Sequence, residues 1–359
     1  MFRGTDTGYP WSPVGGGAAT SSSPVTSTVD FDRPGKRVGT LRVPRSTNES
    51  GWSSLFIPAV CIANGTGPTV LVAGGVHGDE PEGQIVALNL AREVQPSDVR
   101  GRLIILPCLS PEASRAYTRL WPSGANLNRS FPGSPAGPAN EQLADYLTRT
   151  LFPLCDAVCD IHSGGRSTMH LPWSEMHMVD DETQRKAMVE AMLAWGTDYH
   201  FIYINIAGGG LLVDEAERQG KIVIGTELGG GGHVTAAIHR LTRWGLANFL
   251  RHTGVLAGAV ETRASRGLPE SVILKALDMS DYNLAPESGL FETTVELGEE
   301  VGRGQVVGRL HFIERPERTP VEVRAGSAGI VCGVRAIAST LQGDCVVVVG
   351  QRCARSELA

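Results

Sequence analysis

The segment VAGGVHGDEPEG, residues 72–83, places side chains capable of metal chemistry directly after an apolar, strand-like run. His77 follows the glycine break, and Glu80 stands three residues later, where a helical pattern begins. One turn of chain therefore brings both side chains to the same point. A second segment, CDIHSGG at residues 159–165, places His162 at the end of another buried-type strand.

Two imidazoles and one carboxylate are a standard three-ligand set for catalytic zinc, which keeps the fourth position for water. In open α/β sheets, functional groups gather at the carboxyl ends of the strands. We therefore expect His77, Glu80 and His162 to meet at one sheet edge and hold one Zn²⁺ per chain. Asp160, two residues before His162, is expected to orient an imidazole N–H.

Chance is the competing interpretation, because a His-x-x-Glu pair is common and a lone histidine is usually solvated or satisfied. The metal hypothesis depends on both glycine-flanked segments together. The remaining histidines lack this context, so they are interpreted as structural or surface residues, with the one after the glycine run, His233, to be re-examined: His170, His177, His200, His233, His239, His252 and His311.

Amide hydrolysis at such a site also needs a carboxylate that moves protons without binding the metal. Glu227 ends another β-type run, in KIVIGTELGGGG, where a buried strand would not otherwise tolerate an acid. We interpret Glu227 as the general base. The alternative is a cap or an ion pair at a strand end.

The loop RLWPSGANLNRSFPG, residues 119–133, is too rich in glycine and proline to form a helix or a strand. It carries Arg119, Asn126, Asn128 and Arg129, and guanidinium groups bind carboxylates through two hydrogen bonds. The loop therefore suits the binding of a substrate carboxylate. A surface loop with solvated arginines explains the same composition equally well.

Composition limits the classes of partner. The 359 residues carry a net charge of -6, so there is no positive excess to neutralise a phosphate backbone, and nucleic acid is not expected as a partner. The sequence has neither a signal-peptide pattern nor an 18-residue apolar run, so no membrane partner is expected. Seven scattered cysteines do not form a disulfide framework, and a reducing cytoplasm is the expected location.

Alternating periodicities predict an α/β fold with a sheet flanked by helices. The expected strands are Ser53–Ile62, Thr69–Val72, Leu103–Pro107, Ala157–Ile161, Phe201–Ile206 and Lys221–Thr226. The expected helices are Glu82–Glu93, Asn140–Leu154, Asp181–Trp195 and Val234–Val255. We expect a flexible arm over residues 1–28, a catalytic domain over 29–264, a C-terminal β-barrel-like domain over 265–351 and a tail over 352–359.

Four motifs in fixed order, GGVHGDEPEG, NLNRSFPG, DIHSGG and TELGGG, resemble the succinylglutamate desuccinylase/aspartoacylase family, a branch of the zinc-carboxypeptidase-like hydrolases. With the segment VDFDRPGKRVGTLRVP and the C-terminal region, the resemblance covers about Pro24 to Gly350. It implies a zinc-carboxypeptidase-like mixed central sheet flanked by helices, followed by an all-β, barrel-sandwich-like domain.

The resemblance also implies roles for the site residues. It implies zinc held by the two histidines and Glu80, with Glu227 as general base and then acid. Asn128 and Arg129 match the pair that holds a substrate carboxylate, and Arg119 is the arginine near enough to polarise the acyl carbonyl.

Two positions bear on specificity. Asn126 stands where the aspartoacylase branch has the aspartate of its Asp-Leu-Asn-Arg motif, which weakens a transfer of aspartoacylase specificity. The resemblance makes Tyr282, in MSDYNLAPESGLF, a contributor that faces the substrate. Packing at the domain junction is the competing interpretation of this tyrosine.

The implied activity is that of a zinc-dependent amidohydrolase, in which zinc-bound water attacks an N-acyl amino acid, with acetyl the favoured acyl group. The motifs are most similar to those of the subgroup that deacetylates N2-acetyl-2,4-diaminobutanoate in ectoine degradation. A deacylase of the succinylglutamate or N-acetylaspartate type, a zinc carboxypeptidase and a catalytically silent metal- or ligand-binding protein stay as alternatives. A small-molecule substrate and a homo-oligomer are the expected partners.

Overall fold

A computed structural model describes residues 23–205 and 208–358 of the chain. Residues 1–22 of the expected arm, Ile206 of an expected strand and Ala359 of the expected tail lie outside the described residues. The end of the expected arm contains strand β1 (Thr26–Ser27), which pairs antiparallel with β2 (Gly35–Arg45).

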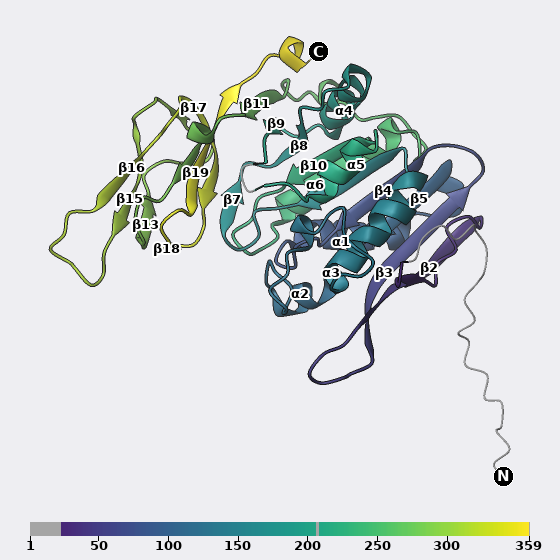
Figure 1. The fold of residues 1–359 in the computed structure, drawn as a ribbon. Helices are drawn as coiled ribbons and strands as arrows, with labels where there is room; N and C mark the ends of the chain where they lie inside the picture. The colour runs from purple at the N-terminus through teal and green to yellow at the C-terminus, as the bar shows by residue number, and fades with distance from the viewer. Residues whose placement is uncertain (1–22, 206–207, 359) are drawn as a thin grey trace.

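A mixed sheet forms the centre of the molecule (Figure 1). From β2, the order across the sheet is β3 (Ser53–Asn64), β5 (Gly101–Leu106), β4 (Thr69–Gly74), β6 (Ala157–His162), β10 (Ile222–Glu227), β8 (Trp173–His177), β9 (Tyr199–Tyr203) and β11 (Val272–Ala276). Strands β5, β4, β6 and β10 run parallel, whereas β3 and β8 are antiparallel to their neighbours β5 and β10. Parallel order places the carboxyl ends of β4, β6 and β10 at one edge.

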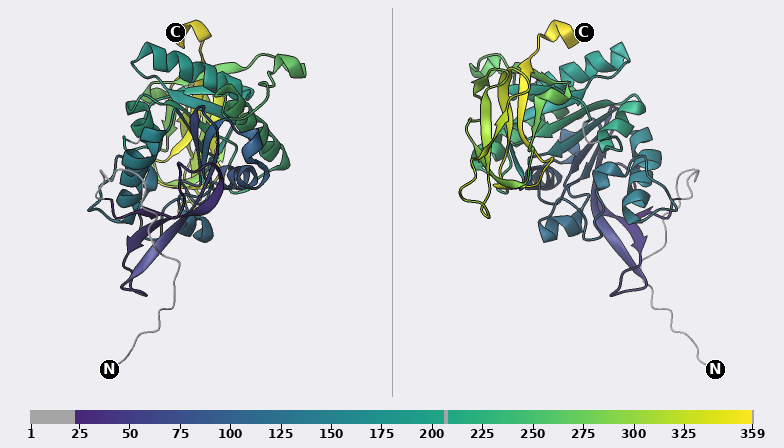
Figure 2. Two further views of the ribbon diagram at one scale, coloured as in Figure 1. Left: turned by 90° about the vertical axis from the view of Figure 1, so that its right-hand side faces the viewer. Right: turned by 60° about the vertical axis from the view of Figure 1, so that its left-hand side comes forward.

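Helices cover both sides of this sheet (Figure 2). Helix α1 (Pro81–Glu93) and α4 (Glu182–Trp195) both pack against α6 (Ala236–His252), while α3 (Ala139–Tyr146) and α5 (Leu212–Arg218) contact β2 and β10, respectively. Because both faces are covered, strands β4 and β6 are buried at every residue, which explains why they are mainly apolar, with Asp160 and His162 of β6 as the charged or titratable exceptions. None of the described helices is long and apolar enough to cross a membrane.

The expected strands and helices form, and the differences have local causes. The segment expected as one helix over Asn140–Leu154 is α-helical only to Tyr146 and continues as a π-helical turn and a 3₁₀ turn. Strand β8 was not expected, because its sequence WSEMH puts polar side chains at buried positions. The short helices α2 (Pro111–Ala116) and α5 were also not expected, since each makes only two turns or fewer.

The C-terminal region is all-β, as expected. Its strands are β12 (Tyr282–Leu284), β13 (Gly289–Thr293), β14 (Glu300–Val301), β15 (Val306–His311), β16 (Val321–Arg324), β17 (Gly329–Arg335), β18 (Ser339–Thr340) and β19 (Cys345–Arg352). They enclose an apolar core of their own and lie at the far end of the sheet from β2 and β3 (Figure 1). The expected boundary after residue 264 precedes β11, which pairs with β9, and the division into domains stays a prediction.

Two antiparallel pairings attach this region to the central sheet. Strand β19 pairs with β11, and β17 pairs with the short strand β7 (Thr168–His170). Strand β7 follows the end of β6 closely, so the C-terminal strands are bonded to the chain beside that strand's carboxyl end. They are therefore in a position to line any pocket at that edge.

All seven cysteines are free. Cys155 and Cys159 are buried, and burial raises the pKa of both thiols. They are apolar packing residues rather than reactive thiols. The cytoplasmic location stays a prediction.

Candidate active site

The carboxyl-terminal edge of the sheet brings together the three residues expected to bind a metal. His77 follows β4, Glu80 directly precedes α1, and His162 is the last residue of β6. One ligand atom from each side chain lies within 4.8 Å of the others, and all three residues are buried. Segments far apart in the sequence thus converge on one point.

Glu80 joins the two imidazoles. Its Oε1 lies 2.7 Å from Nδ1 of His77, and its Oε2 lies 2.7 Å from Nδ1 of His162. Burial alone would raise the pKa of Glu80, but the two imidazoles hold that pKa well below its usual value. The carboxylate is therefore ionised and available as a ligand.

His162 is held from behind by Asp160, whose Oδ2 accepts a hydrogen bond from Nε2 at 2.9 Å. A carboxylate only accepts, so Nε2 carries the proton and Nδ1 is directed toward Glu80. Burial lowers the pKa of His162, yet Asp160 and Glu80 together raise it well above its usual value. This is the arrangement by which a carboxylate fixes the tautomer of a metal-binding histidine.

These residues fit a divalent cation. In the contacts to Glu80 each imidazole nitrogen carries a proton, and a cation at the same point would replace these protons. Within the described chain, Nε2 of His77 is buried without a hydrogen-bond partner, so its ring is held through Nδ1 alone. A cation bound to Nδ1 would anchor that ring. Two nitrogen donors and one carboxylate match the ligand set of catalytic zinc.

Close packing of the backbone makes this convergence possible. A Cβ added at Gly83 would lie 2.6 Å from the carbonyl oxygen of Ile161, so glycine lets α1 approach β6 directly. Asp79 has a different task, because its Oδ2 accepts a hydrogen bond from the backbone N–H of Arg166 at 3.1 Å. Asp79 thus fixes the turn that follows His162.

Glu227 ends β10 and lies in register with His162 on the neighbouring parallel strand β6. About a quarter of its side chain (25%) is exposed, and it lines the pocket at this edge. Burial, with Glu80 and then Glu175 nearby, raises the pKa of Glu227 well above its usual value. A carboxyl group with a raised pKa beside a metal site suits both uptake and return of a proton.

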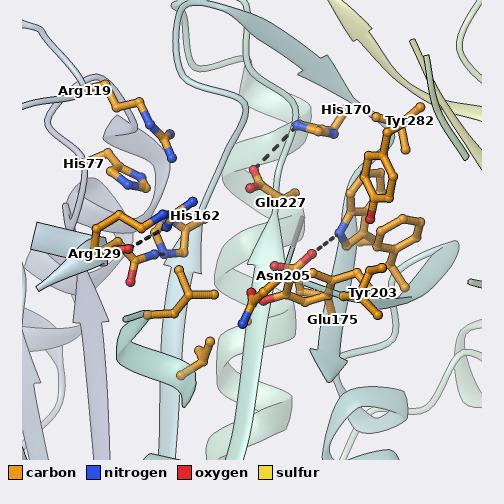
Figure 3. Close-up of a pocket in the computed structure, with 18 residues that line it drawn as sticks. His77, Arg119, Arg129, His162, His170, Glu175, Tyr203, Asn205, Glu227 and Tyr282 are labelled. Carbon is orange, nitrogen blue, oxygen red and sulfur yellow. Dashed lines mark hydrogen bonds and ion pairs between the residues drawn. The ribbon is translucent and has the colours of Figure 1, made fainter. Parts of the chain in front are cut away.

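His170 stands beside Glu227, with its Nε2 3.9 Å from Oε2 of the glutamate (Figure 3). Burial lowers the pKa of His170 to about 4, so its imidazole is neutral. The sequence interpretation had grouped His170 with structural or surface histidines. It reaches the pocket because β7 pairs with β17 of the C-terminal region.

Three residues of the arginine-rich loop line the pocket: Arg119, Asn128 and Arg129. Nη1 of Arg119 lies 3.1 Å from Oε1 of Glu80, which places this guanidinium beside the candidate metal position. Asn128 accepts a hydrogen bond from the backbone N–H of Leu212 at 2.8 Å, and Arg129 donates to the carbonyl oxygen of Asn128 at 2.5 Å. Asn128 thus fastens the loop to α5, while Arg119 and Arg129 of the same loop are exposed.

Asn126 and Tyr282 take different places. Asn126 is not among the lining residues; its Oδ1 accepts a hydrogen bond from the backbone N–H of Asn128 at 2.9 Å and caps the turn Leu127–Arg129. It positions the loop instead of contacting the pocket. Tyr282 lines the pocket and also packs at the junction, since its hydroxyl donates to the carbonyl oxygen of Ala276 at 3.2 Å.

The pocket has a volume of about 190 Å³ and extends from the histidines to the C-terminal strands. Sequence reasoning missed much of its lining: His170, Trp173, Glu175, Phe201, Tyr203 and Asn205. One signal was present, because Trp173 and Glu175 alternate in β8 and so share a face. An acid inside a buried strand was the same signal that identified Glu227.

Comparison with known proteins agrees with this architecture. Residues 66–253 match the family model described as the succinylglutamate desuccinylase/aspartoacylase catalytic domain. Over 332 residues, the chain is 39% identical to the N-alpha-acetyl-L-2,4-diaminobutyric acid deacetylase of Halomonas elongata, covering 92% of this chain and 95% of the relative. The chain belongs to the succinylglutamate desuccinylase/aspartoacylase family, and the expectation of an amide hydrolase is confirmed.

Solved structures extend the likeness to the whole fold. The product-bound structure of the ectoine utilization protein EutE (DoeB) from Ruegeria pomeroyi has a TM-score of 0.87 and 38% identity, covering 92% of this chain and 99% of that chain. A succinylglutamate desuccinylase/aspartoacylase from Rhodobacter sphaeroides gives a TM-score of 0.86 and 38% identity, over 91% of this chain and 98% of that one. The expected fold class, including its C-terminal β region, is confirmed.

Proposed function

We propose that the protein is a zinc-dependent amidohydrolase that removes an acyl group, with acetyl favoured, from an N-acyl amino acid. N2-acetyl-2,4-diaminobutanoate is the leading candidate substrate, supported by the named activity of the Halomonas elongata relative. The observation that carries the proposal is the buried His77, Glu80 and His162 cluster with Glu227 in register beside it.

Zn²⁺ held by the cluster would polarise the acyl carbonyl and lower the pKa of a water molecule. Glu227 takes a proton from the attacking water and passes it to the leaving amine nitrogen. Its raised pKa supports the second step, because the carboxyl group holds the proton until the amine accepts it. Arg119 is placed beside Glu80 and stabilises negative charge that develops on the carbonyl oxygen.

Arg129 and Asn128 hold the substrate carboxylate. Arg129 lines the pocket with its guanidinium near His162 (Figure 3), and the hydrogen bond between Asn128 and Leu212 fixes the loop that carries both. Asn126 caps that loop and acts as a positioning residue. A substrate held at its carboxylate presents its acyl amide to Glu227 in a repeatable orientation.

The shape of the pocket favours a small N-acyl amino acid over a peptide. Tyr282 and Val348, both from the C-terminal strands, line it together with residues of the central sheet. A volume of about 190 Å³ lies below the usual size of ligand pockets for larger molecules. Zinc carboxypeptidase activity is therefore the less favoured alternative. A homo-oligomeric state stays a prediction.

The proposal is tested by metal analysis and by acid release from a panel of N-acyl amino acids and short peptides. Wild type is expected to bind zinc and to release acetate from N-acyl amino acids. Glu227→Gln should retain the zinc and lose about 10²- to 10⁴-fold in kcat, the usual contribution of a positioned general base.

A matched control is Glu215→Gln, which alters a buried carboxylate of α5 that lies outside the pocket and is bonded to Arg218. It should behave as wild type. Near-normal turnover in Glu227→Gln would contradict the mechanism, and zinc binding without any turnover in wild type would support the silent-protein alternative.

A further inference from the structure

A second buried carboxylate, Glu175, lines the pocket and is not used by the proposed chemistry. It lies in the middle of β8, between β10 and β9. Its Oε2 accepts a hydrogen bond from Nε1 of Trp173 at 2.7 Å. Across the described residues this indole is its one hydrogen-bond donor. Burial of a carboxylate with so little compensation is costly unless a ligand supplies positive charge.

Aromatic rings surround this carboxylate. The rings of Trp173 and Phe201 stack with centroids 4.5 Å apart, and Phe201 and Tyr203 stack at 6.4 Å. Tyr282 contributes a further ring from the C-terminal region, and Figure 3 shows Glu175 beneath it and beside Tyr203. A carboxylate set among aromatic faces is the environment in which proteins bind ammonium groups.

The charges of the pocket are separated. Its two arginines, Arg119 and Arg129, lie on the side of His77 and His162, whereas Glu175 and the aromatic rings lie on the other side of Glu227 (Figure 3). No lysine or arginine is present among the described lining residues on the Glu175 side. The pocket is therefore suited to a ligand that is negative at one end and positive at the other.

Glycine keeps space open beside Glu175. Gly225 of β10 is the direct cross-strand partner of Glu175. A Cβ built at Gly225 would lie 3.1 Å from Oε1 and 3.2 Å from Cγ of Glu175. Any larger side chain at this position would occupy the space in front of Oε1, whereas the hydrogen bond from Trp173 is accepted by Oε2.

We infer that Glu175 and the aromatic rings around it form a subsite for a positively charged substrate side chain, one that ends in an ammonium group. This inference rests on the proposed function, because the carboxylate of the substrate is placed at Arg129. An N-acyl diamino acid meets both ends of the pocket with opposite charge. N-acetylaspartate and succinylglutamate would instead place a second carboxylate beside Glu175, which like-charge repulsion disfavours.

The acidity of Glu175 is consistent with this role. Burial raises its pKa to about 7, because the side chains around it compensate the ionised carboxylate poorly. An ammonium group in contact with it would stabilise the ionised form and lower that pKa. The free energy of this contact is then available for substrate selection.

The test compares three N-acetyl amino acids with side chains of similar length on the zinc-loaded enzyme: N2-acetyl-2,4-diaminobutanoate, N-acetylnorvaline and N-acetylglutamate. Wild type is expected to prefer the diaminobutanoate derivative over the norvaline derivative in kcat/KM, with the glutamate derivative poorest. Glu175→Gln keeps the shape and removes the charge. This variant should reduce the ratio of kcat/KM for the diaminobutanoate derivative to kcat/KM for the norvaline derivative by about 10- to 100-fold. That is the range for a lost hydrogen bond to a charged group.

Two further variants control for structural damage. Glu215→Gln, the buried carboxylate outside the pocket, should keep the wild-type ratio. Gly225→Ala preserves the charge of Glu175 but narrows the space beside it. It should lower kcat/KM for the diaminobutanoate derivative more than for N-acetylalanine, whose side chain is too short to reach the subsite.

The outcomes separate the two proposals. The subsite is overturned, and the deacylase function stands, if wild type hydrolyses N-acetylnorvaline or N-acetylglutamate with the same kcat/KM as the cationic substrate. The same conclusion follows if Glu175→Gln lowers kcat/KM for all three substrates by the same factor. If wild type hydrolyses none of them, the proposed function fails. Calorimetry with free 2,4-diaminobutanoate and norvaline then tests the subsite. The subsite requires wild type to bind the diamino acid more tightly than norvaline and Glu175→Gln to lose this difference. Equal affinity of wild type for the two amino acids overturns it.

Discussion

The two ends of the pocket are built in different ways. At one end, His77, Glu80, His162 and Glu227 stand at or just beyond strand ends within short, glycine-containing motifs. The other end is assembled from the middle of β8, from β9 and from the C-terminal strands, as with Glu175. Strand β10 contributes to both ends, through Gly225 and Glu227, but the other segments differ, so substrate preference can change at one end with little effect on the chemistry at the other.

Apart from the metal ligands and Glu227, the arginine loop offers the largest expected effect. Arg129→Ala should lower kcat/KM by about 100-fold, mainly through KM, because a charge-assisted contact to the substrate carboxylate is lost. Arg129→Lys should recover only part of this loss, since lysine lacks the planar fork. Steady-state kinetics on N-acetylnorvaline measure both variants. This substrate has no ammonium group for Glu175, so the measurement reports on the metal-site end of the pocket alone.

A matched control for this experiment is Arg115→Ala, which changes an exposed arginine of α2 outside the pocket. Its KM should equal that of wild type. An unchanged KM in Arg129→Ala would mean that the substrate carboxylate binds elsewhere. Arg129 would then not be the positively charged end of the pocket.

At the metal-site end, Asp160 is expected to contribute to zinc affinity through His162. Asp160→Asn removes the acceptor that fixes the Nε2 proton of His162, so zinc affinity should fall by about 10- to 100-fold. Competition with a zinc chelator measures this affinity. Asp156→Asn, an exposed carboxylate just before β6, should leave it unchanged. Zinc affinity equal to wild type in Asp160→Asn would remove the proposed role of the carboxylate.

The Glu175 end predicts a pH dependence with a defined sign. Its carboxyl group, with a pKa raised to about 7 by burial, is neutral below that pH and ionised above it. Only the ionised form attracts an ammonium group. The dissociation constant of 2,4-diaminobutanoate should therefore fall by about 10-fold from about pH 6 to pH 8. The same titration with norvaline, or with Glu175→Gln, should be nearly flat; a similar slope in all three would assign the dependence to another group.

Local pattern predicted the chemical end because the relevant signals are local. An apolar run begins each of the strands β6 and β10, and the strands end at His162 and Glu227, respectively. The sequence interval alone placed Glu80 beside His77. The register between β6 and β10, which sets Glu227 next to His162, is a tertiary pairing that the strand patterns alone did not predict.

The other end could not be predicted in the same way. Strand β8 has no apolar pattern, because hydrogen bonds satisfy its buried polar side chains. Oγ of Ser174 lies 2.8 Å from Nδ1 of His200, and Glu175 accepts a hydrogen bond from the indole of Trp173. His170 enters the pocket through pairing with Gly333, which no local pattern encodes. The role of Asn126 could not be predicted for another reason. A loop sequence does not show which amide side chain caps a turn of the backbone and which faces the ligand.

The zinc content of Glu80→Gln, measured beside that of Glu227→Gln and wild type, tests the central claim most directly. Wild type and Glu227→Gln should each retain about one zinc per chain, whereas Glu80→Gln should lose most of it, because the shared carboxylate between His77 and His162 is gone. Full zinc retention in Glu80→Gln would contradict the account. It would place the ion elsewhere, for example at the cluster of His177, Asp214 and Glu217.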